Sequence, residues 1–522
     1  MADRHVVLAA KGGGIVFGGR LFVWAARFGL AVLLARLLGA DLYGVYNIAL
    51  SIATLGAAFA VIGLDSALIR YMAVYSRRAD RAGLLGTLRV GLGLPLLASL
   101  VAALVLVAFA GPISRDIVGD PRMEAPIRII AILVPAMVLN SVLAASLQGA
   151  QRIGWAVLAE QFAQPIVRFA VLAVFAVIGM TAEFALLGAL LATLAATLLL
   201  GWFLHRQVSL TGITGDDVRA APGEMLRFSA PVYFSNLINT FGGNLQTILL
   251  GGMASIASAG IFTVASQVML MGAIFHSAIV QASMPIFAEL QDTQERARLH
   301  ALYRTTSKWT FTLNLPFFLV AVLFPLALLS IFGPEFMDGA PALVILAFAS
   351  LINAGTGTSG AVLDMTGHTR VKLINSSLAV GLAIGLNLFL IPEFGITGAA
   401  IASLGSVATV NLLRVAEVWW LVRVEPYDLS WAKPLLAGAA AATIGWMVAM
   451  LTQSTGLLLS SALGAAALGL AYAGLLVVLG LSDDDRIVVA RAARKFTRRR
   501  GGSPGGGSPG GIARAEAPGE ST

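Results

Sequence analysis

The sequence contains no cysteine and little charge. Its 522 residues include no Cys, and Asp, Glu, Lys and Arg together make up only 12%. The missing thiols exclude disulfides, thiolate nucleophiles and thiolate metal sites. A soluble domain carries about a quarter charged residues. A charged fraction only half as large indicates that the chain is not a soluble protein.

Motifs for enzymes and for nucleotide binding are also missing. The chain has no G-x-x-x-x-G-K-[ST] phosphate loop and no H-E-x-x-H zinc motif, and its five His are scattered without ligand spacing. The glycine-rich stretch 12–19 lies in an apolar segment, where close helix packing is its expected role. We therefore expect no metal, no cofactor and no catalytic residue, and predict that the protein is not an enzyme.

Long apolar blocks dominate what is present. Hydrophobic residues make up 58% of the chain and recur in blocks of spanning length. A membrane-spanning helix needs about 20 such residues, and the chain offers about fourteen of these blocks between residues 13 and 481. Strands of a β-barrel would be shorter and would alternate. The prediction is an all-α integral membrane protein of about fourteen transmembrane helices in a lipid bilayer.

Basic residues lie in the gaps between the apolar blocks. The formal net charge of +8 therefore indicates membrane orientation, and we expect no nucleic-acid partner. Only four basic residues, Arg36, Arg115, Arg122 and Arg128, fall on the side opposite the termini. This asymmetry predicts a multi-pass protein of the cell inner (plasma) membrane with both termini cytoplasmic. The segment 482–522 is basic, then Gly/Ser/Pro-rich, and is predicted to be a disordered cytoplasmic tail.

An internal repeat divides the apolar blocks. YGVYNIALSI begins at 43 and resembles AGIFTVASQV at 259, an offset of 216; GDPRMEAP at 119 resembles PEFMDGAP at 334, an offset of 215. Two six-helix bundles in the same orientation follow, residues 1–208 and 209–424, with two additional helices in 425–481. Transporters with parallel repeats bind substrate between their halves.

The strongest candidates for site residues are arginines that lie inside apolar blocks. Arg20 and Arg27 stand about two turns apart on one face of the first predicted helix, and Arg168 lies within the fifth. An intramembrane Arg costs about 2.5–3.5 kcal/mol on insertion scales, so it usually faces a wet cavity or a partner. Guanidinium groups match phosphate oxygens in pairs. We predict that these three arginines bind an anionic, phosphorylated group.

The corresponding helix of the second repeat offers neutral amides instead of charge. These residues are Asn236, Asn239, Asn244 and Gln246. Amides suit sugar hydroxyls, which predicts a cavity for a phosphorylated lipid that carries sugars. The alternative is that the amides bridge packed helices.

Acidic residues in or beside the apolar blocks are candidates for coupling transport to an ion such as H+ or Na+. They are Asp65, Glu160 and Asp364. Helix capping is the alternative role for the two Asp, which stand near helix ends, and Glu160 has the alternative of pairing with a loop Arg.

Residues 33–73 resemble the opening of the polysaccharide-repeat flippases, the O-antigen and exopolysaccharide branch of the multidrug/oligosaccharidyl-lipid/polysaccharide exporter superfamily. The resemblance rests on ARLLG (35–39), on Tyr43, Gly44 and Tyr46, and on GL..AL.RY (63–71), with weaker support from QASMPIFAEL (281–290) and GITGAAIAS (395–403).

The resemblance implies two six-helix bundles in a V with two extra helices. It also implies translocation of undecaprenyl-diphosphate-linked oligosaccharides from the cytoplasmic to the outer leaflet by alternating access, beside a polysaccharide polymerase and glycosyltransferases. Arg20 and Arg27 would then take the diphosphate. Lipid II flippases and multidrug exporters of the same superfamily are the alternatives, and a membrane glycan polymerase or ligase is disfavoured by short outer loops.

Overall fold

The computed structural model describes residues 2–78, 80–207, 222–293 and 295–479, except for the side chains of residues 2–22, 239, 273 and 369. All regular secondary structure within these ranges is helical, which confirms the predicted all-α class. The predicted tail 482–522 lies outside the described residues.

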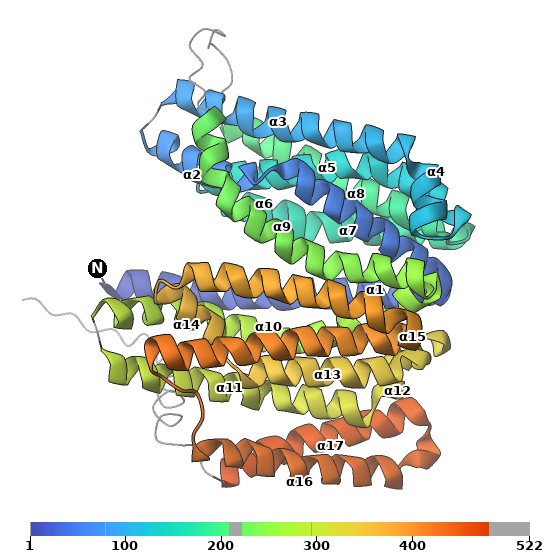
Figure 1. Ribbon diagram of the computed structural model, residues 1–522, viewed down its shortest axis with the longest axis vertical. Coiled ribbons are helices and arrows are strands. Elements are labelled where there is room, and N and C mark those ends of the chain that lie inside the picture. The colour runs from blue at the N-terminus through green and yellow to red at the C-terminus, as the bar shows by residue number, and fades with distance from the viewer. Residues whose placement is uncertain (1, 79, 208–221, 294, 480–522) are drawn as a thin grey trace, which may run out of the picture.

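Two helical bodies make up the molecule, and they lie close together at one end and diverge at the other (Figure 1). The first body holds the second half of helix α1 and most of the helices up to residue 207. Its helices are α1 (Ala2–Val61), α2 (Leu64–Arg77), α3 (Arg81–Ala108), α4 (Ala110–Pro112), α5 (Glu124–Gly149), α6 (Ile153–Val157), α7 (Gln164–Ile178) and α8 (Ala182–Gln207).

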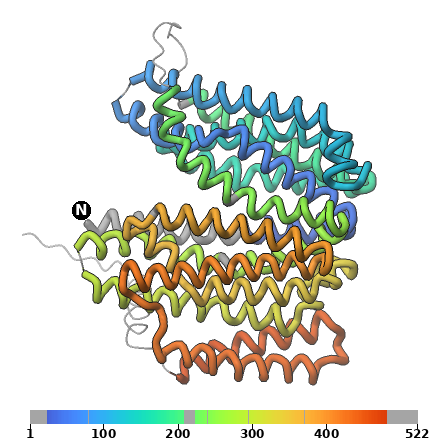
Figure 2. The backbone as a smooth tube through the Cα atoms, in the orientation of Figure 1, coloured from blue at the N-terminus to red at the C-terminus, as the bar shows by residue number. Residues whose placement is uncertain are grey.

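The second body follows from residue 256 onward, and the chain can be traced through both bodies in Figure 2. Its helices are α10 (Ile256–Asp292), α11 (Arg296–Leu323), α12 (Pro325–Ser330), α13 (Ala340–Gly355), α14 (Ser359–Met365) and α15 (Thr369–Glu417). Helices α16 (Ala432–Leu451) and α17 (Leu457–Val478) pair with each other at its edge and pack on α11. Their peripheral place agrees with the prediction of two helices outside the repeat.

Helix α9 (Pro222–Met253) contacts both bodies. Near its start, Met225 packs with Leu64 and Ala67 of α2. Near its end, Gln246 bonds to α15. It thus runs obliquely from the divergent end to the convergent end (Figure 1). Sequence periodicity alone does not predict this crossing, and the boundary at 208/209 stays a prediction.

Helices α1 and α15 are each bent at a glycine. Gly39 has φ 70° and ψ 176°, and Gly395 has φ 53° and ψ −126°, which are non-helical values that L-residues avoid. Each bend lets one long helix double back as two apolar segments. The end of the molecule where α1 bends is called the Gly39 end below.

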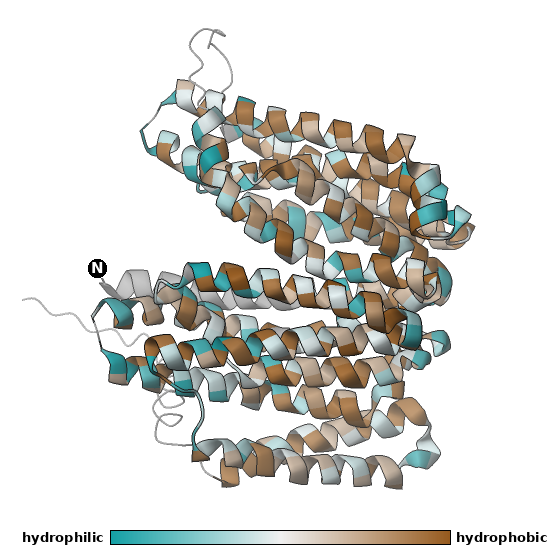
Figure 3. Ribbon diagram, viewed as in Figure 1, coloured by the Kyte–Doolittle hydropathy of each residue, from teal (hydrophilic) through white to brown (hydrophobic). Residues whose placement is uncertain are grey.

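Length and composition support a multi-pass membrane protein. Within the described residues, nine helices are long and apolar enough to cross a membrane, or ten if the bent α10 counts as one span. Bent helices such as α15 are counted once there, so the number fourteen stays a prediction. Large apolar side chains such as Val177 and Leu470 are exposed, as expected on a lipid-facing surface. Hydrophilic residues gather mainly at the helix ends (Figure 3).

Polar contacts at the Gly39 end attach both sides of the α1 bend to the second body. The Nε of Arg36 donates a hydrogen bond to the carbonyl oxygen of Ile331 at 2.7 Å. The backbone N–H of Ala40 donates to Oε2 of Glu335, also at 2.7 Å. These bonds fix the bend of α1 against the loop that precedes α13.

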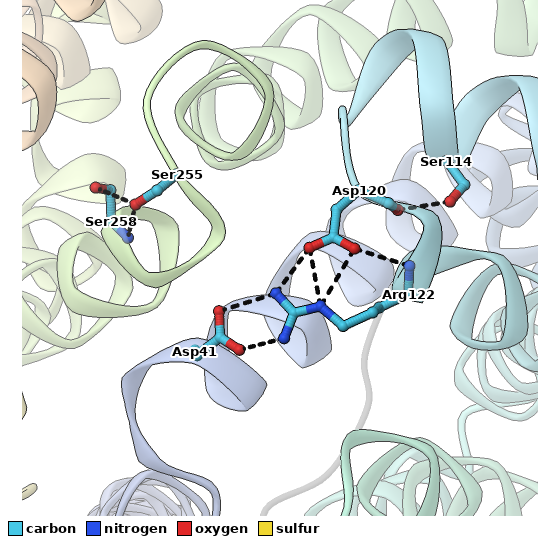
Figure 4. Close-up of polar contacts among 6 residues, drawn as sticks. All are labelled: Asp41, Ser114, Asp120, Arg122, Ser255 and Ser258. Atoms are coloured by element: carbon cyan, nitrogen blue, oxygen red, sulfur yellow. Dashed lines mark hydrogen bonds and ion pairs between the residues drawn. The ribbon is translucent and has the colours of Figure 1, made fainter.

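A charged cluster supports the same bend from the side of the first body (Figure 4). Arg122 donates from Nη1 to Asp41 at 2.6 Å and from Nη2 to Asp120 at 2.7 Å. The Arg122 guanidinium lowers the pKa of Asp120 below its usual value. The ion pair of Asp120 with Arg122 therefore contributes stability at neutral pH that is lost as the pH falls through this lowered pKa. Ser255, drawn in the same figure, caps the start of α10 by accepting from the N–H of Ser258.

Candidate functional site: a polar cavity between two repeats

A cavity of about 590 Å³ lies between helices α1, α9, α10 and α13. Most of its lining side chains carry hydroxyl or amide groups. They are Asn47, Ser51, Thr54, Asn244, Gln246, Thr247, Thr263, Ser266, Gln267 and Ser350. None of the described residues that line it is ionisable. Such a surface can exchange hydrogen bonds with hydroxyl-rich groups without favouring either charge.

The two repeats contribute equivalent positions to this cavity. At the offset of 216 found in the sequence, Asn47 corresponds to Thr263, Leu50 to Ser266, Ser51 to Gln267 and Thr54 to Leu270, and all eight residues line it. The cavity therefore lies where the repeats face each other.

A second cavity of about 410 Å³ shares Thr54 with the first and continues toward the divergent end. Asn236 and Asp65 line it, from α9 and from the start of α2. Gly63 fixes this corner, because it has φ 68° and a Cβ there would lie 2.7 Å from the Cβ of Tyr233. Two predicted site residues thus lie on one polar path along α1.

The predicted amides have different surroundings. Gln246 lines the cavity and also bridges helices, since its Nε2 lies within hydrogen-bond distance of Asn387 Oδ1 at 3.2 Å, the Ala399 carbonyl at 2.7 Å and Ser403 Oγ at 2.9 Å. Asn244 lines the same cavity, and its Nδ2 donates to the carbonyl of Thr240 within its own helix at 2.9 Å. The side chain of Asn239 lies outside the described residues.

These surroundings predict opposite results for two substitutions. Gln246→Ala is expected to lower the stability of the protein by about 1–3 kcal/mol, because it leaves buried polar groups of α15 without a partner. Asn244→Ala is the matched control and should change stability little. Thermal unfolding of the purified variants in detergent measures both. An equal loss of Tm in the two variants would contradict the bridging role.

Arg168 is half-buried and has no acidic partner in the described part of the chain. Its guanidinium carbon lies 5.6 Å from the ring centre of Tyr46, and its Nε and Nη2 are buried and make no hydrogen bond. A buried charge with unused donors is costly unless a partner binds it at some stage. The geometry therefore leaves donors of one guanidinium available for an anion.

The segments of α1 and α7 that carry Arg27 and Arg168 are in contact. A Cβ on Gly29 would lie 3.9 Å from Cζ of Phe169, which places the two helices side by side there. Arg27 is exposed and lies within electrostatic reach of Glu160. Arg20 belongs to α1, but its side chain lies outside the described residues.

Glu160 lies in a π-helical turn, Leu158–Ala163, that precedes Pro165. Proline has no N–H to continue the α-helical ladder, and π turns are frequent at functional sites. Eight residues of regular helix would leave Glu160 and Arg168 about 80° apart, and one residue absorbed by the wider turn reduces this to about 20°. The Glu160 carboxylate accepts from Nδ2 of Asn140 at 2.8 Å.

The other two predicted coupling residues have structural partners. Asp65 accepts from the N–H of Ser66 at 2.7 Å in the first turn of α2. Asp364 forms an ion pair of 2.7 Å with Lys372. Neither contact is a helix cap, so the coupling and capping roles of both residues stay predictions.

Tyr43 and Gln267 connect Arg168 to the cavity, and sequence reasoning did not single them out as site residues. Tyr43 is buried and lies within electrostatic reach of Arg168, and its hydroxyl accepts from Nε2 of Gln267 at 3.3 Å. Gln267 lines the cavity. Applying the repeat offset to Ser51 reaches Gln267, so the signal was present in the sequence.

Comparisons with known proteins agree with this architecture. Residues 9–291 match the family model described as polysaccharide biosynthesis protein. Stage V sporulation protein B of Bacillus subtilis is 24% identical over 448 residues, which cover 79% of this chain and 85% of that protein. A putative O-antigen transporter of Shigella flexneri is 21% identical, covering 71% of this chain and 88% of its own length.

A solved structure shares the fold at low identity. The inward closed conformation of the lipid II flippase MurJ is similar with a TM-score of 0.68 and 13% identity, over 88% of this chain and 98% of that one. The family model covers more than half of the sequence. The chain therefore belongs to the polysaccharide biosynthesis protein family.

Proposed function

We propose that this protein flips undecaprenyl-diphosphate-linked oligosaccharide repeat units from the cytoplasmic to the outer leaflet by alternating access, for cell-surface polysaccharide synthesis. The single observation that carries the proposal is a neutral polar cavity between two repeats, beside an arginine whose buried Nε and Nη2 make no hydrogen bond. Sugars would occupy the cavity, and the diphosphate would bind Arg168 together with Arg27 and Arg20.

The charge of the site favours an anionic lipid over a cationic drug. The described residues that line the large cavity include no Asp or Glu. Arg168 adds a cation at its edge, through Tyr43 and Gln267. Guanidinium donors match phosphate oxygens in pairs. A site for cationic drugs would need the opposite sign.

The orientation follows from the positive-inside rule. The Gly39 end carries the few arginines of the sparsely charged side, among them Arg36 and Arg122, and would face outward. The protein would then lie in the inner membrane of the cell, with both termini in the cytoplasm. The described contacts would correspond to a state closed on the outside.

Ion coupling and protein partners belong to the same proposal. Glu160 is the best placed of the three acidic candidates, because it lies within electrostatic reach of Arg27 and accepts a hydrogen bond from the neutral amide of Asn140. It would couple transport to H+ or Na+. Glycosyltransferases would build the substrate and a polymerase would consume it, while this chain itself catalyses no bond change.

Vesicle reconstitution tests the proposal. Purified protein is placed in liposomes with a fluorescent polyprenyl-diphosphate disaccharide, and an impermeant quencher reports which leaflet holds the label. We expect faster exchange of this lipid than in protein-free vesicles, and no acceleration of an otherwise identical neutral glycolipid or of a cationic dye. The proposal would be contradicted if the neutral lipid were accelerated equally. It would also be contradicted if folded protein did not accelerate the diphosphate lipid. A preference for lipid II over other diphosphate lipids would instead favour the lipid II alternative.

A further inference from the structure

Two glycines at equivalent positions of the repeat pack directly against each other at the Gly39 end. Gly44 and Gly260 are related by the offset of 216 and both are buried in helices, α1 and α10. A Cβ added to Gly260 would lie 2.9 Å from the backbone N and 3.2 Å from the Cα of Gly44. Real Cβ atoms rarely approach a backbone so closely, so a methyl group does not fit between the helices.

The contact is reciprocal in a way that follows the repeat. A Cβ on Gly44 would overlap the carbonyl oxygen of Ile256, and a Cβ on Gly260 would overlap the carbonyl oxygen of Ala40. Ala40 and Ile256 are themselves related by the same offset of 216. The first turns of two equivalent helices thus meet backbone to backbone, as small residues allow.

The contact between Gly44 and Gly260 lies next to the polar cavity, on the side of the Gly39 end. Asn47 and Thr263, about one helical turn beyond the two glycines, line the cavity from each repeat. On the other side are the bond from Ala40 to Glu335, which joins the two bodies, and the bond from Arg36 to Ile331 just before the bend. Tyr43, next to Gly44, bonds to Gln267 on the opposite body.

We propose that Gly44 and Gly260 form a glycine seal that closes the cavity at the Gly39 end and must separate for the cavity to open there. No side chain lies between the two helices at the glycines, so α1 and α10 are either packed together there or separated. The contact is therefore a two-state element. The seal sets the balance between closed and open states. The inference rests on the proposed transport function for its role, but the seal itself is tested without transport.

The absence of cysteine makes accessibility a clean test. A single Ser266→Cys reporter is placed in the cavity, and an impermeant maleimide is applied to right-side-out and to inside-out membrane vesicles. With Gly44→Ala or Gly260→Ala, labelling from the Gly39 side is expected to rise about tenfold, because overpacking by one methyl group shifts the two-state balance toward separation. The matched control is Gly93→Ala in α3, where an added Cβ meets nothing within 4 Å and labelling should not change.

A second variant keeps the test decisive if the alanine variants do not fold. Glu335→Ala removes the bond to Ala40 and adds no atoms at the crossing, so labelling from the same side should rise by a smaller factor. Unchanged or slower labelling in the folded variants would overturn the seal. Loss of flipping by a protein whose labelling still responds to the glycines would overturn the proposed function and leave the seal intact.

Discussion

Arg168→Gln is expected to remove most of the transport activity while leaving the protein as stable as before, or more stable. The buried Nε and Nη2 of Arg168 have no described partner, so the resting protein carries an uncompensated charge that the substitution removes. In the transport cycle the same donors would bind phosphate. Hydrogen bonds to charged groups contribute about 1.5–3 kcal/mol each, so losing two corresponds to a drop of about a hundredfold or more.

Flipping rate and thermal unfolding, measured on the same preparation, check this prediction. Arg168→Lys retains the charge but not the planar fork, and should recover only part of the rate. Arg89→Gln is the matched control, since Arg89 is an exposed arginine in the apolar helix α3, and it should leave both quantities unchanged. A purely structural arginine would behave differently, because Arg168→Gln would then lower Tm and the loss of activity would follow the loss of folded protein.

The sequence predicted the class of the fold and much of the character of the site. Long apolar blocks require helices, because backbone groups in lipid must be satisfied within one segment. The position of Arg168 inside such a block predicted that it faces a wet cavity or a partner, but it lines neither of the two cavities described above. Gln246 lines the large cavity and also bridges α9 to α15, so its sugar-binding role stays a prediction beside its bridging role.

Features that depend on how the two bodies pack were not predictable from periodicity. The crossing of α9 between the bodies places Asn236 in one cavity and Asn244 in another. Asp65 and Asp364 find local partners that single-residue reasoning does not identify. In the sequence, Tyr43 is part of a family motif. Its bond to Gln267 depends on how the two repeats face each other, which the sequence alone does not give.

A large side chain at either of two repeat-related cavity positions is expected to block transport. Ser266→Trp and Leu50→Trp each project an indole into the space of about 590 Å³, from opposite repeats. We expect the flipping rate of the oligosaccharide lipid to fall on the order of a hundredfold. This corresponds to a transport barrier about 2.7 kcal/mol higher. Ser266→Trp should have the larger effect, because Leu50 already fills part of its position.

Size dependence separates this steric effect from misfolding. A polyprenyl diphosphate without sugars needs little of the cavity, so its exchange should survive both tryptophan variants while that of the oligosaccharide lipid is lost. Ala440→Trp is the control for added bulk, because Ala440 is exposed on the peripheral helix α16. If sugar-bearing and sugar-free lipids lose exchange equally in both variants, the cavity does not hold the sugars. Recognition of the substrate would then rest on the arginines and on candidates outside this cavity, such as Asn236.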